Sequence, residues 1–170
     1  MDMKIEITAE HRWLQALAGE WTYEGECSMG PDQPGMKFAG SETMRSVGEA
    51  WIVGEGKGTM PDGSPATTLI TVGYDPAKKS FVGTFVGSMM THLWVYERGS
   101  LDATGKVLTL EAEGPNCMAE GQTAKFRDVV TLEGPDSRVL QGHILGPDGA
   151  WHVMMTTRYT RKNAARLAAE

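Results

Sequence analysis

Alternation of apolar and polar residues dominates the chain after residue 18 and predicts β-strands. In the first such segment, one face carries Trp21, Tyr23, Gly25 and Cys27, and the other carries Thr22, Glu24 and Glu26. Further strand-like segments cover residues 36–47, 50–58, 66–74, 80–88, 91–98, 106–113, 123–133, 138–145 and 150–161. Turn sequences rich in proline and glycine separate them, for example Asp75-Pro76 and Gly146-Pro147-Asp148-Gly149. Because proline fixes one turn dihedral and glycine supplies positive φ, the chain can reverse between strands.

A short amphipathic helix is predicted before the first strand, over residues 8–18. Thr8 is a suitable N-cap, and the apolar stripe consists of Trp13, Leu14 and Leu17. About ten short strands joined in sequence can close on themselves, and closure removes exposed sheet edges. We therefore predict an all-β fold, a single antiparallel barrel of about ten strands, with the helix closing one end and one domain covering residues 1–170.

Three glycines fall on alternate positions of one predicted strand, as Gly54-x-Gly56-x-Gly58. A phosphate-binding loop would precede a helix, whereas this segment lies inside a strand. We therefore expect these glycines to mark bends or bulges.

Composition and charge narrow the function classes. A chain of 170 residues is long enough for one domain with its own core. Cys27 and Cys117 are too few for a disulfide scaffold or a metal knuckle, which favours reduced thiols. The charged N-terminus lacks the apolar stretch of a secretory signal, so we expect a cytoplasmic protein with no membrane partner. A net charge of −6 disfavours nucleic-acid binding.

One predicted strand carries an unusual mixture of side chains on a single face. Alternation places Met90, His92, Trp94 and Tyr96 together, where an ordinary core would be aliphatic. Methionine adapts to irregular apolar shapes, and aromatic side chains keep a hydrogen-bonding group at their tip. This face predicts a cavity for a small, mostly apolar molecule, and the alternative is that the side chains fill the barrel, which would then act as an interaction module.

The last two predicted strands add further candidates. His143 and Met155 are assigned to the same ligand cavity, and His152 lies nearby on the last strand. A histidine that faces a barrel interior can ligate haem iron or relay a proton, although most such histidines are hydrogen-bonded core residues. The sequence assigns no particular cofactor and no oligomeric state.

Acidic residues within predicted strands provide a third hypothesis, a cavity enzyme with acid–base chemistry. The candidates are Glu42, Glu55, Glu111 and Asp128. A buried carboxylate close to His92 could act as a general base, whereas strand glutamates usually face solvent. No zinc-ligand spacing or nucleophile elbow is present, so we assign no catalytic and no metal-binding residue.

Several segments resemble a known family over nearly the whole chain. The stretches HRWLQALAGEW, MGPDQPGMKFAG, PATTLITVGYDP, FVGTFVGSMMTHLWVYE and the closing YTRK are similar to the bacterial domain-of-unknown-function 1579 family. That family is similar in turn to the calycin group, which includes lipocalins, fatty-acid-binding proteins and haem-binding nitrobindins. The resemblance implies a calycin-like barrel and leaves the activity open.

The calycin resemblance also implies roles for particular residues. In calycins, the tryptophan of a Gly-x-Trp motif packs beneath an arginine or lysine from the end of the last strand. Gly19-Glu20-Trp21 matches that motif, and Arg161 is the expected partner of Trp21, with Arg158 as the second choice. Nitrobindins carry their haem-ligating histidine near the C-terminus. The last strand here offers only His152, whose alternation phase opposes that of Arg161, so the chain departs from the nitrobindin pattern.

Overall fold

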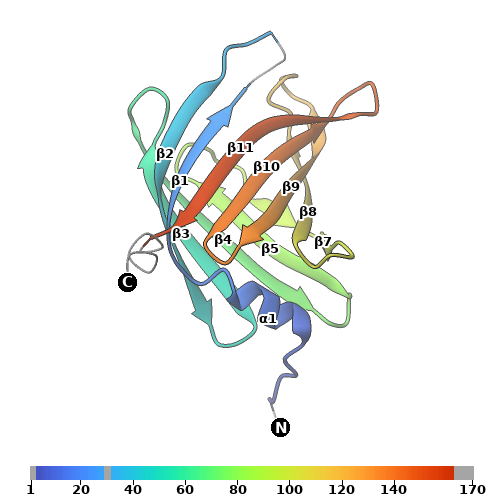
Figure 1. Cartoon of the computed structure of the whole chain (residues 1–170). Coiled ribbons are helices and arrows are strands. Elements are labelled where there is room, and N and C mark those ends of the chain that lie inside the picture. Colours follow the sequence, from blue (N-terminus) through green and yellow to red (C-terminus); the bar gives the residue numbers. More distant parts are fainter. Residues whose placement is uncertain (1–2, 29–31, 163–170) are drawn as a thin grey trace.

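The predicted strands form one sheet that curves into a nearly closed antiparallel barrel (Figure 1). The structure is a computed structural model that describes residues 3–28 and 32–162. It has one helix, α1 (Ala9–Gln15), which lies at one end of the barrel. The strands are β1 (Gly19–Cys27), β2 (Met36–Val47), β3 (Trp51–Thr59), β4 (Pro65–Asp75), β5 (Ser80–Gly87), β6 (Trp94–Tyr96), β7 (Arg98–Leu101), β8 (Val107–Pro115), β9 (Thr123–Gly134), β10 (Ser137–Leu145) and β11 (Trp151–Arg161).

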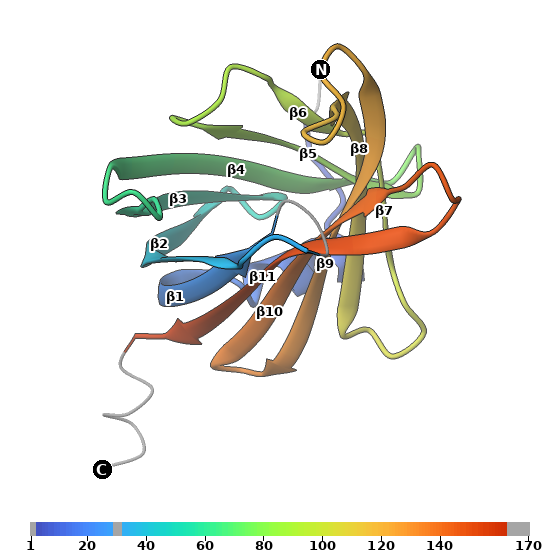
Figure 2. The same ribbon diagram turned by 90° about the horizontal axis from the view of Figure 1, so that it is seen from above.

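The barrel closes through a single bent segment. Neighbouring strands pair in chain order, and β1 pairs with β11, so the sheet ends at β6 and β7, which only Glu97 separates. Tyr96 of β6 lies opposite Gly83 of β5, whereas Gly99 of β7 lies opposite Leu110 of β8. The segment therefore changes partner in the middle and joins the two edges of the sheet, as the view down the barrel illustrates (Figure 2).

This closure corrects one predicted strand. A single strand over residues 91–98 was expected, but pairing begins at Trp94 and changes partner after Tyr96, which gives eleven strands. The backbone N–H of Gly99 donates to the Ser80 Oγ at 3.0 Å, which ties β7 to the start of β5. The change of partner follows from closure, because the first part of the bent segment must pair its backbone with β5 and the second part with β8.

The helix is shorter than predicted, because the chain tightens after Gln15. The backbone N–H groups of residues 16–18 donate to the carbonyls three residues earlier, at 3.0–3.2 Å. Such i→i−3 bonds form a narrower turn than an α-helix. Gly19 then adopts a φ of 129°, which favours glycine and redirects the chain into β1. Among the described residues, no helix has the length and hydropathy to cross a membrane.

The packed core lies at the α1 end of the barrel. Leu14 and Leu17 of the α1 segment are buried among inward-facing side chains from the strands. Those side chains include Trp21, Met44, Ile52, Val72, Phe81, Tyr96, Leu108, Leu110 and Tyr159. Since α1 packs against β3 and β4 at this end, it seals the barrel there.

The inward-facing glycines of β3 do not mark bulges. The register of β3 with both neighbours runs without a shift, which contradicts the bulge among the two predicted alternatives, bends or bulges. A Cβ added at Gly54 would lie 2.3 Å from the Met44 Sδ, and one at Gly58 would lie 2.5 Å from the Tyr23 Oη. The side chains of Met44 and Tyr23 therefore occupy the space beside Gly54 and Gly58 and leave no room for a side chain at either position.

Candidate ligand-binding lumen

The half of the barrel opposite α1 is not filled. Residues directly opposite each other in paired strands share a face, so the buried Trp21 identifies the inward face and the register carries it from strand to strand. Many inward-facing residues of this half are only half-buried, which means that their remaining exposed surface faces the barrel interior. We call this space the lumen and define it by Tyr23, Phe38, Phe85, Trp94, Ala112, Phe126, Asp128, Leu140, Gly142 and Met155.

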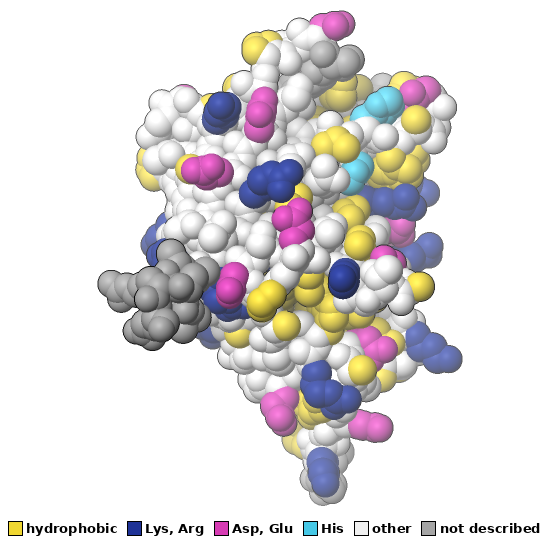
Figure 3. Space-filling view, in the orientation of Figure 1, with side chains coloured by type: hydrophobic (Ala, Val, Ile, Leu, Met, Phe, Trp, Pro, Cys, Tyr) yellow, Lys and Arg dark blue, Asp and Glu magenta, His cyan; other side chains and the backbone are white. Residues whose placement is uncertain are grey.

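A cavity of about 1000 Å³ lies at the entrance of the barrel, between the β8–β9 and β10–β11 hairpin loops. We call it the mouth cavity. Its lining includes Met118, Ala119, Ala124, Ile144 and Met154, with Glu113, Lys125, Asp148 and His152 as charged or titratable groups. Ile144 lies opposite Phe126, so the lumen begins directly below this cavity. Hydrophobic and histidine side chains meet on this upper right part of the surface (Figure 3).

An aromatic cluster packs against β8 and β9 near the entrance. The ring centroid of Trp94 lies 4.7 Å from that of His92 and 4.8 Å from that of Phe126, both in edge-to-face geometry. The His92 Nε2 is buried and has no hydrogen-bond partner among the described residues. A Cβ at Gly114 of β8 would lie 2.3 Å from the Trp94 ring, so this glycine makes room for the cluster.

The structure separates the four residues predicted to share one strand face. Trp94 and Tyr96 lie on β6 and face inward, but Met90 and His92 belong to the loop before β6. Met90 is 39% exposed, and its Sδ accepts a hydrogen bond from the Trp94 Nε1 at 3.1 Å. The prediction of a strand face shared with Trp94 and Tyr96 was wrong for Met90 and His92, because the chain leaves β5 in a turn instead of an extended strand.

Below the aromatic cluster, a carboxyl group faces the interior. The Tyr96 hydroxyl donates to the Asp128 Oδ2 at 2.5 Å and so connects β6 with β9. Burial raises the pKa of Asp128, while the hydrogen bond from Tyr96 and the charge of His143 oppose that shift. Burial likewise raises the pKa of Tyr96 well above its ordinary value. Tyr96 itself belongs to the packed core, and its hydroxyl group connects that core to Asp128 in the lumen.

A second buried carboxyl group lies deeper, at the boundary with the packed core. Arg138 of β10 donates to Glu42 of β2, and both side chains are buried. Burial raises the pKa of Glu42, while the charge of Arg138 lowers it. The Arg138 guanidinium lies 4.3 Å from the Trp21 ring centroid and 4.0 Å from that of Tyr159. Arg138 is a residue that the sequence analysis missed, although its alternation with Leu140 was a usable signal.

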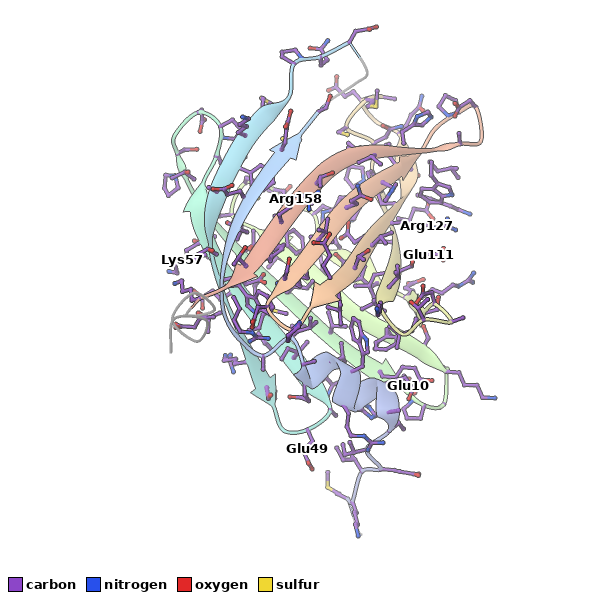
Figure 4. All side chains as sticks on the ribbon, viewed as in Figure 1. Glu10, Glu49, Lys57, Glu111, Arg127 and Arg158 are labelled. Atoms are coloured by element: carbon purple, nitrogen blue, oxygen red, sulfur yellow. The ribbon has the colours of Figure 1, made fainter. Side chains whose placement is uncertain are left out.

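Trp21 seals the α1 end between two guanidinium groups. Trp21 is 1% exposed, and the guanidinium of Arg161 lies 4.2 Å from its ring centroid. The two residues meet because Trp21 of β1 lies directly opposite Arg161 of β11. Arg161 also donates to the carbonyls of Ala16 and Ala18, at 3.1 and 2.6 Å. Arg158 instead lies on the outer face, 68% exposed and 3.6 Å from Glu133 (Figure 4).

The two histidines of the last strands occupy unexpected positions. His143 lies opposite Arg127 and Val153, residues of the outer face, although its Nδ1 is buried without a hydrogen-bond partner among the described residues. A register shift at His143 leaves Met154 as an extra residue. This bulge reverses the alternation, so His152 lies opposite the buried Ile144 at the mouth cavity.

His152 also bears on the haem and enzyme hypotheses. Its Nε2 lies 3.1 Å from both carboxylate oxygens of Asp148, so the nitrogen that a haem iron would need is already engaged. The pair meets the distance required of an acid–base dyad, but its side chains are 54% and 56% exposed. Solvent screens the interaction between such exposed groups. The pair therefore supports neither the haem hypothesis nor the enzyme hypothesis.

The four predicted acidic candidates divide between the two faces. Glu42 and Asp128 face inward, whereas Glu55 and Glu111 face outward. Glu111 forms an ion pair with Arg127 at 2.9 Å on the outer face, where Figure 4 places the two side by side. Within residues 3–28 and 32–162, no group of three His, Cys, Asp or Glu side chains could hold a metal ion.

The strands and the lumen define a nearly closed, all-β antiparallel barrel. The chain belongs to the family described as "Protein of unknown function (DUF1579)", whose model matches residues 6–161. Among curated proteins, none matches the sequence.

Solved structures with the same fold are remote in sequence. The crystal structure of Rv2717c from M. tuberculosis is 14% identical with a TM-score of 0.61, and the match covers 92% of this chain and 99% of that one. The S-type phycobiliprotein lyase CPES from Guillardia theta is 10% identical with a TM-score of 0.59, over 89% and 92% of the two chains. EF1p2_mFAP2b bound to DFHBI is 16% identical with a TM-score of 0.50, over 91% and 100%. At these identities the matches establish the fold alone.

Proposed function

We propose that the protein binds a small, mostly apolar molecule in the lumen and admits it through the mouth cavity. The observation that carries this proposal is the half-buried state of inward-facing apolar residues such as Phe85, Ala112 and Leu140. Burying such surface against a ligand contributes about 25 cal/mol per Å². A structural neighbour of similar architecture, EF1p2_mFAP2b, was solved bound to DFHBI, which supports small-molecule binding by a barrel of this kind.

The proposed ligand would meet three kinds of surface in turn. The mouth cavity provides adaptable methionines, Met118 and Met154, with charged groups at its rim. Trp94 and Phe126 would then form an aromatic wall, and Met155 would line the opposite side of the lumen. Asp128 supplies a polar group at the inner end. An apolar wall with few oriented polar groups is typical of small-molecule sites.

The test fills the lumen with a side chain of the protein itself. Gly142 faces inward, and a Cβ added there would lie 3.5 Å from the nearest atom, an ordinary contact distance. Gly142→Leu therefore projects a side chain into the lumen. The matched control, Thr22→Leu, adds the same side chain to the outer face of β1. Binding is followed by the fluorescence of N-phenyl-1-naphthylamine, a neutral apolar probe, and by the change in tryptophan fluorescence.

We expect the natural sequence and Thr22→Leu to bind the probe alike, and Gly142→Leu to bind it about 10-fold more weakly or not at all. Thermal unfolding of both variants checks that the barrel is intact. Equal binding by Gly142→Leu and the natural sequence, or no binding by either, would show that the lumen is not the site.

A further inference from the structure

The two inward-facing carboxyl groups differ in how they are paired. Glu42 forms an ion pair with Arg138, and both side chains are buried. Asp128 forms no ion pair with any Lys or Arg of residues 3–28 and 32–162, and its Oδ2 accepts a hydrogen bond from the neutral hydroxyl of Tyr96. Since the charges of Glu42 and Arg138 cancel, Asp128 leaves the interior with an uncompensated acidic group.

The second oxygen of Asp128 lies beside the inward-facing Gly142, which has no side chain to cover it. Gly142 lies directly opposite Asp128, and a Cβ at Gly142 would lie 3.5 Å from the Asp128 Oδ1. Any larger side chain at that position would cover this oxygen. The β-bulge between β10 and β11 begins at the next residue, and bulges often lie beside functional sites.

We propose that Asp128 recognises a positively charged nitrogen, and that the ligand is an apolar amine whose ammonium group binds the Asp128 Oδ1. This inference rests on the proposed function and specifies its ligand class. A carboxylate ligand would instead approach two acidic side chains, and the one buried cation among the described residues, Arg138, is already paired with Glu42. An unpaired carboxylate at the end of an apolar lumen selects the opposite charge.

Three other titratable groups among the described residues influence Asp128: two inward-facing tyrosines, and His143 on the outer face of β10. Tyr96 approaches from β6, Tyr159 from β11, and His143 contributes a favourable charge from β10. Burial raises the pKa of Asp128, so acidification protonates this carboxyl group before an ordinary surface aspartate. An alkylammonium group keeps its charge throughout that range. Affinity for an apolar amine should therefore fall as the pH is lowered.

The experiment compares three ligands that share one alkyl chain and differ in the head group. Decylamine, 1-decanol and decanoate are titrated into the protein in a calorimeter at neutral pH. We expect decylamine to bind about 10-fold more tightly than 1-decanol, and decanoate to bind more weakly than either. Asp128→Asn keeps an acceptor for the Tyr96 hydroxyl and should reduce decylamine binding to the level of 1-decanol.

Glu55→Gln is the matched control, because it removes a carboxylate from the outer face of β3. It should keep the preference for decylamine. If 1-decanol binds and decanoate matches or exceeds decylamine, the amine proposal is overturned while the proposed function stands. If none of the three binds, the proposed function fails as well. If Asp128→Asn and Glu55→Gln lose the same amount of decylamine affinity, the amine is attracted by the overall negative charge of the protein, and the proposal is overturned.

A second measurement does not depend on whether the variant folds. The affinity of the natural sequence for decylamine is measured from about pH 8 to about pH 5, with 1-decanol as the uncharged reference. Decylamine affinity should fall with acidification while 1-decanol affinity stays level. Where Asp128→Asn is folded, the pH dependence of its decylamine affinity should be smaller than that of the natural sequence. A decylamine affinity independent of pH would contradict the proposal.

Discussion

The two ends of the barrel interior are built on the same alternation but end in different states. At the α1 end, Leu14 and Leu17 enter from outside the sheet and meet the inward side chains of the strands. At the opposite end no element in the described part of the chain enters the barrel, and inward residues such as Ala112 and Leu140 stay half-buried. Alternation decides which way a side chain points, whereas filling depends on what the rest of the chain inserts.

The charged groups repeat this contrast. At the α1 end, Arg138 and Glu42 pair with each other, and Arg161 binds main-chain carbonyls. In the lumen, Asp128 has a neutral partner, the Tyr96 hydroxyl. Each member of a buried pair offsets the burial cost of the other, whereas an unpaired buried acid is costly and is a candidate for ligand recognition.

Removing Trp21 should produce the largest loss of stability. Trp21→Ala deletes a buried indole between two guanidinium groups and should lower the free energy of unfolding by about 3 to 5 kcal/mol, as large aromatic deletions do. Urea denaturation measures the loss. The control is Trp51→Ala on the outer face, where the side chain is exposed and the expected loss is less than about 1 kcal/mol. Similar losses at both positions would contradict the assignment of the packed core.

Breaking the buried ion pair should cost slightly less. Arg138→Met leaves Glu42 buried without its partner, and we expect a loss of about 3 kcal/mol. Replacing both, with Glu42→Leu added, should recover most of that loss, because the uncompensated charge is removed with its partner. Urea denaturation of the single and double variants tests this. A double variant less stable than Arg138→Met would mean that Glu42 carries no penalty when it is buried without Arg138.

A matched pair of leucines compares the two ends directly. Leu108 is 1% exposed in the packed core, and Leu140 is half-buried in the lumen wall. Leu108→Ala should cost about 3 kcal/mol, whereas Leu140→Ala should cost about 1 to 2 kcal/mol, because part of its surface already faces open space. Urea denaturation provides the comparison: if the free energy of unfolding depends equally on urea concentration in both variants, the midpoints report the difference in stability. Equal losses would indicate that the lumen is as tightly packed as the core.

Much of this architecture follows from the sequence, because the period of two is a local property. It predicted the strands and the inward face of β1. The contact between Trp21 and Arg161, at the paired ends of β1 and β11, was implied by the resemblance to calycins and is confirmed. The resemblance of the chain to the DUF1579 family was confirmed as well.

The site was less predictable, because its geometry depends on long-range pairing. The extra residue Met154 reverses the phase of His152, and no local pattern marks that bulge. The pairing of Asp128 with Tyr96 joins residues 32 positions apart. Glu42 and Asp128 could not be separated from Glu55 and Glu111 by residue type, although alternation with inward apolar neighbours distinguishes them. Whether His92, Trp94 and Met155 contact a ligand stays a prediction.

The smallest expected effect is the loss of folding stability caused by the buried carboxyl group of Asp128. Burial raises the pKa of Asp128 in the folded protein above its value in the unfolded chain, so the folded state binds the proton more tightly. The stability from that proton is fully present below the unfolded pKa, near 3.9, and is lost as the pH rises through the folded pKa. Asp128→Asn cannot ionise. It should therefore be more stable than the natural sequence at neutral pH, by about 0.5 to 2 kcal/mol, and the difference should disappear near pH 4.

Urea denaturation of both proteins at several pH values measures this difference. Glu55→Gln again serves as the control, because its outer-face carboxylate is exposed and paired only with the exposed Lys57. The control should change stability by less than about 0.5 kcal/mol at any pH. A variant Asp128→Asn that is less stable than the natural sequence at neutral pH would mean that the carboxylate stabilises the barrel. Asp128 would then belong with Glu42 and Arg138 in the packed end, and the contrast between the two ends would rest on packing alone.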